Sequence, residues 1–507
     1  MKLRLLCFSF VSLATMRAID LTALDAYNRK ARDDWRTPGF AIAIVQDDKV
    51  LVTRGYGVRE LNRPEPVTGH TLFAIASNTK AFTAAGIAIL VHQKKLKWND
   101  RVQTHLPWFQ VFDDAWISHE TRLDDLLCHR MGFRTFGGDL IWWNTSYSAE
   151  EVVRRARFLK PAFGFRAGNG YSNIAFIAAG EIIGRASQST WPDFIRQQIL
   201  SPLGMTNTVL SVSELPQRSD VATPHGADDD GRPYAIAWQG WDNCAAAGGI
   251  ISSVTDLSQW LRLQLNEGKL GDRTLWSPKE AWKMWSMHNP AAMAPGSLAR
   301  DPSFSLKGRG LGWGLADYKG ELVVSHGGAY DGMFSHTVMV PRKKIGIVVL
   351  SNGMTGLPSS VASYALDALL GANDRDWSAE NLKKAAEARA TKQKTGAAEA
   401  AKRIPNTSPS RPLEQYAGRY GGPMYGDATI THENNRLILR FQPNPELAGE
   451  LVHWQHDEFE IKWHKKFAWF GDGKVRFFLD RESRPIEFRM DVPNEDFWFD
   501  ELEFRRK

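Results

Sequence analysis

Residues 73–91, FAIASNTKAFTAAGIAILV, place a hydroxyl and an amine one helical turn apart, at Ser77 and Lys80. Residues i and i+3 are neighbours on a helix, so the Lys80 amine is within reach of the Ser77 oxygen. Serine is a weak nucleophile until a neighbouring group accepts its proton. The apolar residues that follow predict a buried helix whose first turn carries Ser77. The pair is therefore a candidate nucleophile with its own base; the alternative is a serine cap beside a solvated lysine.

Two later segments carry further candidates. Tyr171 and Asn173 lie in the Gly-rich turn FRAGNGYSN, directly before another apolar stretch. His326 and two glycines follow the strand-like residues ELVV. A tyrosine phenol can act as base or acid, and glycines let a substrate approach a strand backbone. Taken singly, each segment also fits a purely structural role, as a half-buried aromatic or a histidine at a strand end.

In the order S-x-x-K, Y-x-N, H-G-G, the three motifs resemble the serine β-lactamase and penicillin-binding-protein superfamily, and most closely its class C-like, CubicO-type esterases and peptidases. The resemblance runs from about Gly39 to about Leu370, with supporting phrases LLCHRMGF, AAAGGIISSVTDLSQWL and VVLSNG. It implies an α+β fold, with an antiparallel sheet flanked by helices and a helical subdomain.

The resemblance also implies a role for each motif residue. Ser77 would attack an acyl carbon and form an acyl-enzyme, while Lys80 and Tyr171 share the proton transfers and the identity of the base stays open. The backbone N–H groups of Ser77 and Ala329 would form the oxyanion hole. The substrate would be bound by the remaining motif residues, which are Asn173, His326, Gly327 and Gly328. Asn173 would hydrogen-bond a substrate amide or the Lys80 amine.

The third motif departs from the family pattern, because β-lactamases and D-alanyl peptidases usually carry Lys-Thr-Gly where this chain has His326-Gly327-Gly328. The change removes a cation and a hydroxyl that hold the substrate carboxylate in those relatives. It argues against penicillins and free D-Ala-D-Ala termini, and favours esters, amides or blocked peptides. His326 itself would either bind an anion when protonated at mildly acid pH, or hydrogen-bond Tyr171.

The resulting functional prediction is a serine hydrolase that cleaves small esters or peptide amides, D-residue-containing ones included, through a Ser77 acyl-enzyme. The alternatives are a β-lactamase or D,D-carboxypeptidase, and a non-catalytic binding module on the same scaffold. Four tryptophans in loop-like regions are expected to line an apolar acyl pocket, or else to pack their loops onto the domain. They are Trp142, Trp143, Trp238 and Trp241.

Composition limits the partners. The 507 residues are 43% hydrophobic and 24% charged, and no run of 18 apolar residues suggests a membrane span. The net charge of +6 falls to +3 without residues 1–18, which hold Lys2, Arg4 and Arg17 and no acid, so a nucleic-acid partner is not expected. Neither Cys128 nor Cys244 has metal-like spacing. We expect a small ester, peptide or amide substrate and no metal or organic cofactor; a homo-oligomer stays open.

The chain divides into four predicted segments. Residues 1–18 have a basic start and an apolar centre, which predict a signal peptide and an exported, periplasmic or secreted protein; a buried first element is the alternative. Residues 19–372 form the predicted hydrolase domain, opened by a hairpin that turns at Asp47-Asp48. Residues 373–411, rich in Ala, Lys and Glu and then in Pro and Ser, predict a helical spacer and a flexible linker. Residues 412–507, with short aromatic-rich β-like runs, predict a lipocalin-like antiparallel barrel.

Overall fold

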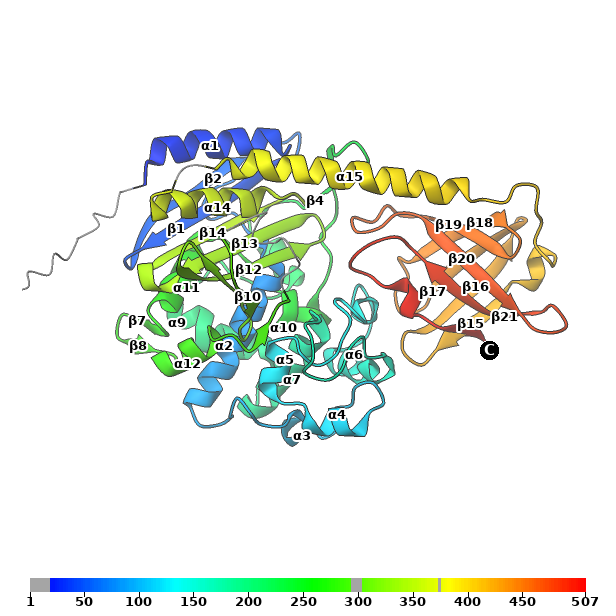
Figure 1. The fold of residues 1–507 in the computed structure, drawn as a ribbon, viewed down its shortest axis with the longest axis horizontal. Coiled ribbons are helices and arrows are strands. Elements are labelled where there is room, and N and C mark those ends of the chain that lie inside the picture. The colour runs from blue at the N-terminus through cyan, green and yellow to red at the C-terminus, as the bar shows by residue number, and fades with distance from the viewer. Residues whose placement is uncertain (1–18, 293–302, 373–374) are drawn as a thin grey trace, which may run out of the picture.

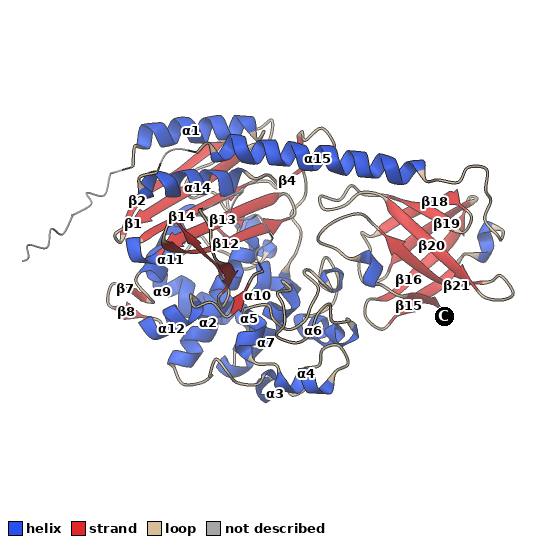
Figure 2. Ribbon diagram, viewed as in Figure 1, coloured by secondary structure: helices blue, strands red, loops and turns tan. Residues whose placement is uncertain are grey.

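The computed structural model describes residues 19–292, 303–372 and 375–507; the predicted signal peptide lies outside these residues. An α+β domain is followed by one long helix and a separate β-barrel (Figure 1). Figure 2 shows the helices gathered around the sheet of the first domain, and the second domain built almost entirely of strands. The predicted fold class is confirmed.

The first domain is organised by one eight-stranded antiparallel sheet, in the order β2-β1-β14-β13-β12-β11-β10-β9. Strands from the two ends of the domain therefore lie side by side in the sheet, where β1 pairs with β14. The strands are β1 (Gly39–Gln46), β2 (Lys49–Gly57), β9 (Asn289–Pro290), β10 (Lys307–Arg309), β11 (Gly314–Tyr318), β12 (Glu321–Tyr330), β13 (Met333–Val340) and β14 (Ile345–Ser351).

The predicted opening hairpin is confirmed, because β1 and β2 pair across Asp47 and Asp48. Both aspartates have positive φ, 50° and 63°. Two successive residues with positive φ form the tight two-residue turn whose twist matches that of the paired strands. Asp adopts positive φ more readily than most residues.

Helices cover both faces of the sheet. Alternate residues of β1 point to opposite sides, as strand geometry requires, and nearly all of them are buried. On one side Phe40, Ile42 and Ile44 pack with α1 (Leu21–Asp34) and α14 (Leu357–Leu370). On the other side Ala41, Ala43 and Val45 belong to a larger core with α2 (Thr79–His92) and α11 (Val254–Leu265). The sheet is thus a buried central layer on which α2 is held.

The helical subdomain lies beyond α2, where α7 (Asn173–Ser187) packs against α2 and α10 (Ala245–Gly248). The other helices of the first domain are α3 (Val102–His105), α4 (Ala115–Glu120), α5 (Leu123–Leu127), α6 (Ala149–Arg155), α8 (Trp191–Ile195), α9 (Ser201–Leu203) and α12 (Pro278–Met284). Its short strands are β3 (Phe73–Ala74), β4 (His225–Ala227), β5 (Pro233–Ala235), β6 (Ile251–Ser252), β7 (Lys269–Leu270) and β8 (Arg273–Thr274).

Helix α15 (Trp377–Ala401) runs from the first domain to the barrel (Figure 1). The residues after it are hydrogen-bonded to the barrel, since the Ile404 N–H donates to Gln455 (2.7 Å) and the Ser410 N–H to Asp457 (3.0 Å). This part of the predicted linker is therefore attached along the barrel surface.

The second domain is a closed antiparallel barrel of eight strands, as predicted. Aromatic side chains such as Tyr420, Phe459, Phe477 and Phe488 contact one another and are buried, so the interior is packed. Its strands are β15 (Gly418–Gly422), β16 (Gly426–Glu433), β17 (Arg436–Phe441), β18 (Ala448–Gln455), β19 (Glu458–Trp463), β20 (Gly473–Leu479), β21 (Pro485–Asp491) and β22 (Phe504–Arg506).

Candidate active site

Ser77 lies in a tight turn, η1 (Ala76–Asn78), directly before α2. The preceding Ala76 has φ of 47°, a region that non-glycine residues rarely adopt. The turn is held to β13, because the Asn78 side chain donates to Ser335 Oγ (2.8 Å) and that hydroxyl donates to the Ile75 carbonyl (2.8 Å). The predicted helix is present and is buried along nearly its whole length. The nucleophile candidate is thus on a strained but firmly anchored turn.

Lys80 reaches Ser77 across one turn, as predicted. Its side chain is fully buried, and Nζ lies 3.1 Å from Ser77 Oγ, 2.6 Å from Asn173 Oδ1 and 2.8 Å from the Ala247 carbonyl. A neutral amine would donate to the two carbonyl oxygens and leave its lone pair for the Ser77 hydroxyl. The arrangement can therefore accept the serine proton.

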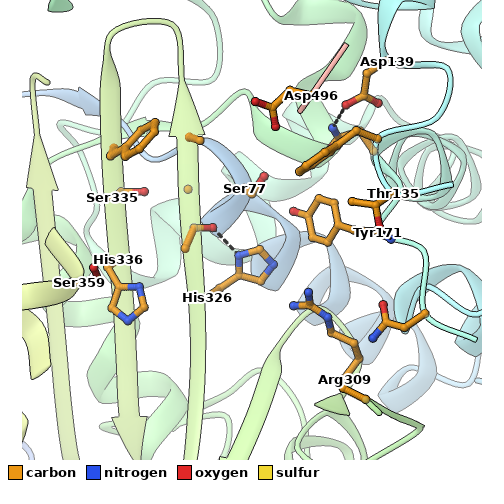
Figure 3. A pocket seen from close by; sticks show the side chains of 18 of the residues that line it. Ser77, Thr135, Asp139, Tyr171, Arg309, His326, Ser335, His336, Ser359 and Asp496 are labelled. Atoms are coloured by element: carbon orange, nitrogen blue, oxygen red, sulfur yellow. Dashed lines mark hydrogen bonds between the residues drawn. The ribbon is translucent and has the colours of Figure 1, made fainter. Parts of the chain in front are cut away.

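Tyr171 stands at the entrance to α7, and Figure 3 shows its hydroxyl pointing toward Ser77. Lys80 Nζ lies 4.8 Å from the centre of its ring. The His129 ring stacks on the Tyr171 ring, with centroids 4.3 Å apart. His129 Nδ1 also accepts the Ser172 N–H (3.1 Å), and burial holds the pKa of His129 well below its usual range. A neutral imidazole therefore orients the tyrosine.

Strand β12 brings the third motif beside the nucleophile. A Cβ added to Gly328 would lie 2.2 Å from the Ile75 carbonyl oxygen and 2.3 Å from Ser335 Oγ, so only glycine allows the strand this close to η1. Gly327, Gly328 and Ala329 all line the same cavity as Ser77. The backbone at Ala329 is thus on the wall where an oxyanion donor is predicted.

His326 is neutral over the physiological pH range. Burial, with a smaller contribution from the charge of Lys80, lowers its pKa to about 3. Its Nδ1 lies 2.6 Å from the Gly327 carbonyl oxygen, which can only accept, so Nδ1 carries the proton and Nε2 is an acceptor. The suggestion that His326 is protonated at mildly acid pH is wrong, because burial disfavours the charged ring.

Asn173 connects Lys80 to a buried carboxyl that sequence reasoning missed. Its Oδ1 accepts from Lys80 while its Nδ2 donates to Asp139 Oδ2 (2.6 Å). Burial raises the pKa of Asp139 to about 8. These contacts fix the orientation of the Asn173 amide. Of the two roles expected for Asn173, a hydrogen bond to a substrate amide or to the Lys80 amine, the structure shows the second.

A cavity of about 940 Å³ surrounds these residues and is lined by both domains. The first domain contributes the three motifs; the barrel contributes Trp469, Asp496 and Phe497 from loops. Barrel residues could not be assigned to the site from sequence, because no motif marks them and more than 300 residues separate them from Ser77.

The four predicted pocket tryptophans divide into two pairs. Trp142 and Trp241 line the cavity and contact each other edge to face, with ring centroids 4.9 Å apart. Trp143 and Trp238 do not line it, and for them the alternative applies, in which a loop tryptophan packs its loop against the rest of the structure. Trp143 packs against the barrel residues Phe467, Phe470 and Phe497. Trp238 packs on Tyr330, with ring centroids 5.4 Å apart. Adjacent residues in a loop point in different directions, which the sequence does not show.

Arg309 is a second functional candidate that the sequence did not reveal. It lies on β10, at one end of the cavity, with its guanidinium carbon 5.5 Å from the centre of the Tyr171 ring. The cavity therefore has a cation even though the third motif lacks the lysine that the family usually carries. A residue on a strand two places along the sheet supplies the charge, and only the sheet order reveals this.

Within the described ranges, no three His, Cys, Asp or Glu side chains gather as they would around a metal ion. In the same residues, no helix is both long and apolar enough to cross a membrane. Cys128 and Cys244 are both free and buried.

A family model described as Beta-lactamase matches residues 24–372, and a model described as a domain of unknown function, DUF3471, matches residues 402–506. Unguisins hydrolase ungD of Aspergillus violaceofuscus is 29% identical over 342 residues, which are 63% of this chain and 59% of the relative's length. Unguisins hydrolase ungD′ of Aspergillus campestris is 28% identical over 438 residues, which are 81% of this chain and 78% of that relative.

Among solved structures, the octameric penicillin-binding protein homologue from Pyrococcus abyssi matches 96% of this chain and 100% of its own, with a TM-score of 0.60 and 22% sequence identity. This likeness concerns the fold. The family model covers more than half of the chain, including all three motifs. The chain therefore belongs to the beta-lactamase family, within the serine β-lactamase and penicillin-binding-protein superfamily, and is an enzyme of the serine hydrolase type.

Proposed function

We propose that the protein hydrolyses small esters or peptide amides, D-residue-containing ones included, through an acyl-enzyme on Ser77. The observation that carries the proposal is the 3.1 Å contact between Lys80 Nζ and Ser77 Oγ in a cavity that a small substrate can enter. The relatives named as hydrolases support the reaction class.

Acylation needs a proton acceptor for Ser77 and a proton donor for the leaving group. Lys80 touches Ser77 Oγ, whereas the Tyr171 hydroxyl has no hydrogen-bond partner among the described residues and faces the cavity. Lys80 therefore takes the serine proton as Oγ bonds to the acyl carbon, and Tyr171 gives a proton to the departing alkoxide or amine as its bond to that carbon breaks; the proton on Lys80 then restores Tyr171. Water attacks the ester carbon and gives a proton to Lys80, the bond from that carbon to Oγ breaks, and Ser77 takes the proton back as the acid leaves.

The negative charge of the tetrahedral intermediate requires donors on the opposite side. The backbone N–H groups of Ser77 and Ala329 are the proposed donors, because β12 lies against η1 with the glycine contact described above. One such donor is typically worth about 3 kcal/mol of transition-state stabilisation.

The test is intact-protein mass spectrometry after reaction with a fluorophosphonate, with Ser77→Ala as the comparison. A panel of p-nitrophenyl esters and of D- and L-aminoacyl amides follows. We expect one adduct on the native protein and none on the variant. A folded native protein that forms no adduct and cleaves nothing in the panel would contradict the proposal and favour a binding role for the site.

A β-lactamase or D,D-carboxypeptidase activity is a second candidate, favoured by the Arg309 cation at one end of the cavity. Nitrocefin and D-Ala-D-Ala peptides, assayed beside the ester panel, distinguish the two. Faster turnover of either than of the esters would select the second candidate.

The location of the protein is also a proposal. The basic and apolar pattern of residues 1–18 supports export, with cleavage of a signal peptide. N-terminal sequencing of the protein recovered from the medium or periplasm tests this, and a retained Met1 would contradict it.

A further inference from the structure

The cavity carries a permanent positive charge at one end. Arg309 supplies the only arginine or lysine side chain among its described lining residues. The guanidinium is half-buried, and no hydrogen bond or ion pair to it occurs within residues 19–292, 303–372 and 375–507. The neighbouring imidazole of His326 is neutral, as shown above. The centre of the Tyr171 ring lies 5.5 Å from the guanidinium carbon, but the planar set of N–H donors has no acceptor in these residues and matches a carboxylate.

The other end carries acidic groups, one from each domain. Asp496 lines the cavity from a barrel loop, and its carboxylate has no hydrogen-bond or ion-pair partner in the described residues. Asp139 is 3% exposed and also lines the cavity, where its carboxyl group is hydrogen-bonded by Asn173 and interacts with the Trp142 indole. Asp496 is therefore the carboxylate at this end that is free to pair with a ligand.

Aromatic rings accompany these acids. Trp142, Trp469 and Phe497 line the same cavity, and Trp469 and Phe497 have ring centroids 5.9 Å apart. Aromatic faces attract cations, and a carboxylate among them adds a full opposite charge. Burial raises the pKa of Asp496 to about 6, so the group is ionised at neutral pH and a bound cation would lower that pKa. The combination suits an ammonium group.

Ser77 separates the two ends. In Figure 3, Asp139 and Asp496 lie on one side of Ser77 and Tyr171, and Arg309 lies on the other. A substrate with opposite charges at its ends would then place the bond between them beside the serine hydroxyl.

We propose that the preferred substrates are short zwitterionic peptides, whose ammonium group binds beside Asp496 and Asp139 and whose carboxylate binds Arg309. This rests on the proposed function. The acyl carbon of the amino-terminal residue bonds to Ser77 Oγ, the amide C–N bond breaks, and the leaving amine takes one proton. Water then releases the first residue, so that two free amino acids or shorter peptides result.

The test uses four forms of one alanyl-alanine peptide, in each stereochemistry: free at both ends, N-acetylated, C-amidated, and blocked at both ends. We expect the free peptide to have the highest kcat/KM, and each block to lower it at least about tenfold. Arg309→Met should abolish discrimination between a free and an amidated C-terminus. Asp496→Asn should abolish discrimination between a free and an acetylated N-terminus. Each variant should leave the discrimination at the opposite end intact.

Two matched variants control for charge and folding. Lys307→Met removes a cation two residues away on the same strand, and Glu495→Gln removes an anion from the same barrel loop; both side chains are exposed and outside the cavity lining. Neither should change discrimination. The rate of Ser77 labelling by a neutral fluorophosphonate, measured for every variant, normalises the results.

The outcomes separate the two proposals. Absence of labelling and of ester cleavage in the native protein would contradict the proposed function. Normal labelling with equal kcat/KM for all four peptide forms, or a preference for the doubly blocked one, would overturn the zwitterion proposal alone. Loss of discrimination at both ends in Lys307→Met or Glu495→Gln would also overturn it.

Discussion

The Asp331 carboxylate accepts the indole N–H of Trp469, at 2.9 Å, and so ties the barrel to the turn that follows strand β12. Its other oxygen accepts the Trp241 N–H at 3.2 Å. Both tryptophans line the cavity. One buried carboxylate therefore holds a wall built from two domains.

Asp331→Asn should loosen this wall. An amide has one acceptor oxygen, so one indole N–H loses its partner, at a cost of about 1–3 kcal/mol in unfolding free energy. We expect a higher KM for p-nitrophenyl esters with large apolar acyl groups, and a smaller change for the acetyl ester.

Asp367→Asn is the matched control for this prediction. Asp367 is also buried and accepts the N–H of Trp377 at 2.7 Å, with Tyr318 and Lys319 as further partners, but it does not line the cavity. Asp367→Asn should lose at least as much stability as Asp331→Asn, with unchanged KM values. Equal KM effects in both variants would show that Asp331 has no special relation to the substrate pocket.

Gly328→Ala should damage the site through a steric clash. The added methyl would lie well inside contact distance of the Ile75 carbonyl and Ser335 Oγ, which are parts of the anchored nucleophile turn. We expect a loss of about 1–3 kcal/mol in stability and slower fluorophosphonate labelling of Ser77. At Gly327 the nearest atoms lie 3.8 Å and 3.9 Å from an added Cβ, so Gly327→Ala should unfold like the native protein. Equal stability of the two variants would contradict the prediction.

Lys80→Met should separate binding from chemistry. The thioether fills similar space but cannot accept the Ser77 proton, so kcat should fall by about 10²- to 10⁴-fold. KM should change little if the bound substrate dissociates faster than it reacts, because KM then equals the dissociation constant. Thermal unfolding checks that the buried site still folds, and a variant with native kcat would assign the proton transfer elsewhere.

Asp139 should make the protein less stable as the pH rises. Its folded pKa of about 8 exceeds the ordinary value near 3.8, so the folded state retains a proton that the unfolded state releases. Its stabilisation is complete below the unfolded pKa and is lost as the pH rises toward 8. The slope at its steepest is about 1.4 kcal/mol per pH unit.

Between pH 6.5 and 8 the effect of Asp139 on stability combines with that of Glu501. The cavity histidine His326, with its lowered pKa, gains its proton only in more acid solution, whereas Glu501, with a pKa of about 7, also titrates in the window. Asp139→Asn should therefore remove part of the fall in melting temperature between pH 6.5 and 8, and Asp139→Asn with Glu501→Gln more of it. An unchanged slope in both would contradict the raised pKa values.

Local patterns in the sequence determined the parts that depend on near neighbours. Ser77 and Lys80 meet because helical geometry brings residues three apart together. The hairpin at Asp47-Asp48 and the aromatic alternation of the barrel strands likewise follow from short-range periodicity. The order of three motifs was enough to indicate the family and therefore the α+β sheet.

Only the tertiary structure decided which distant residues share the cavity. Arg309 reaches it because β10 is two strands from β12, and Asp496 reaches it because the barrel docks through contacts such as Trp469 with Asp331. The pKa of Asp139 and the neutrality of His326 depend on burial, which no residue pattern specifies. The direction of each side chain within its loop likewise decides that Trp142 lines the cavity while Trp143 packs against the barrel. These features arise from packing between segments far apart in the chain. The same local sequence patterns are compatible with many such packing arrangements, so the patterns alone do not select one.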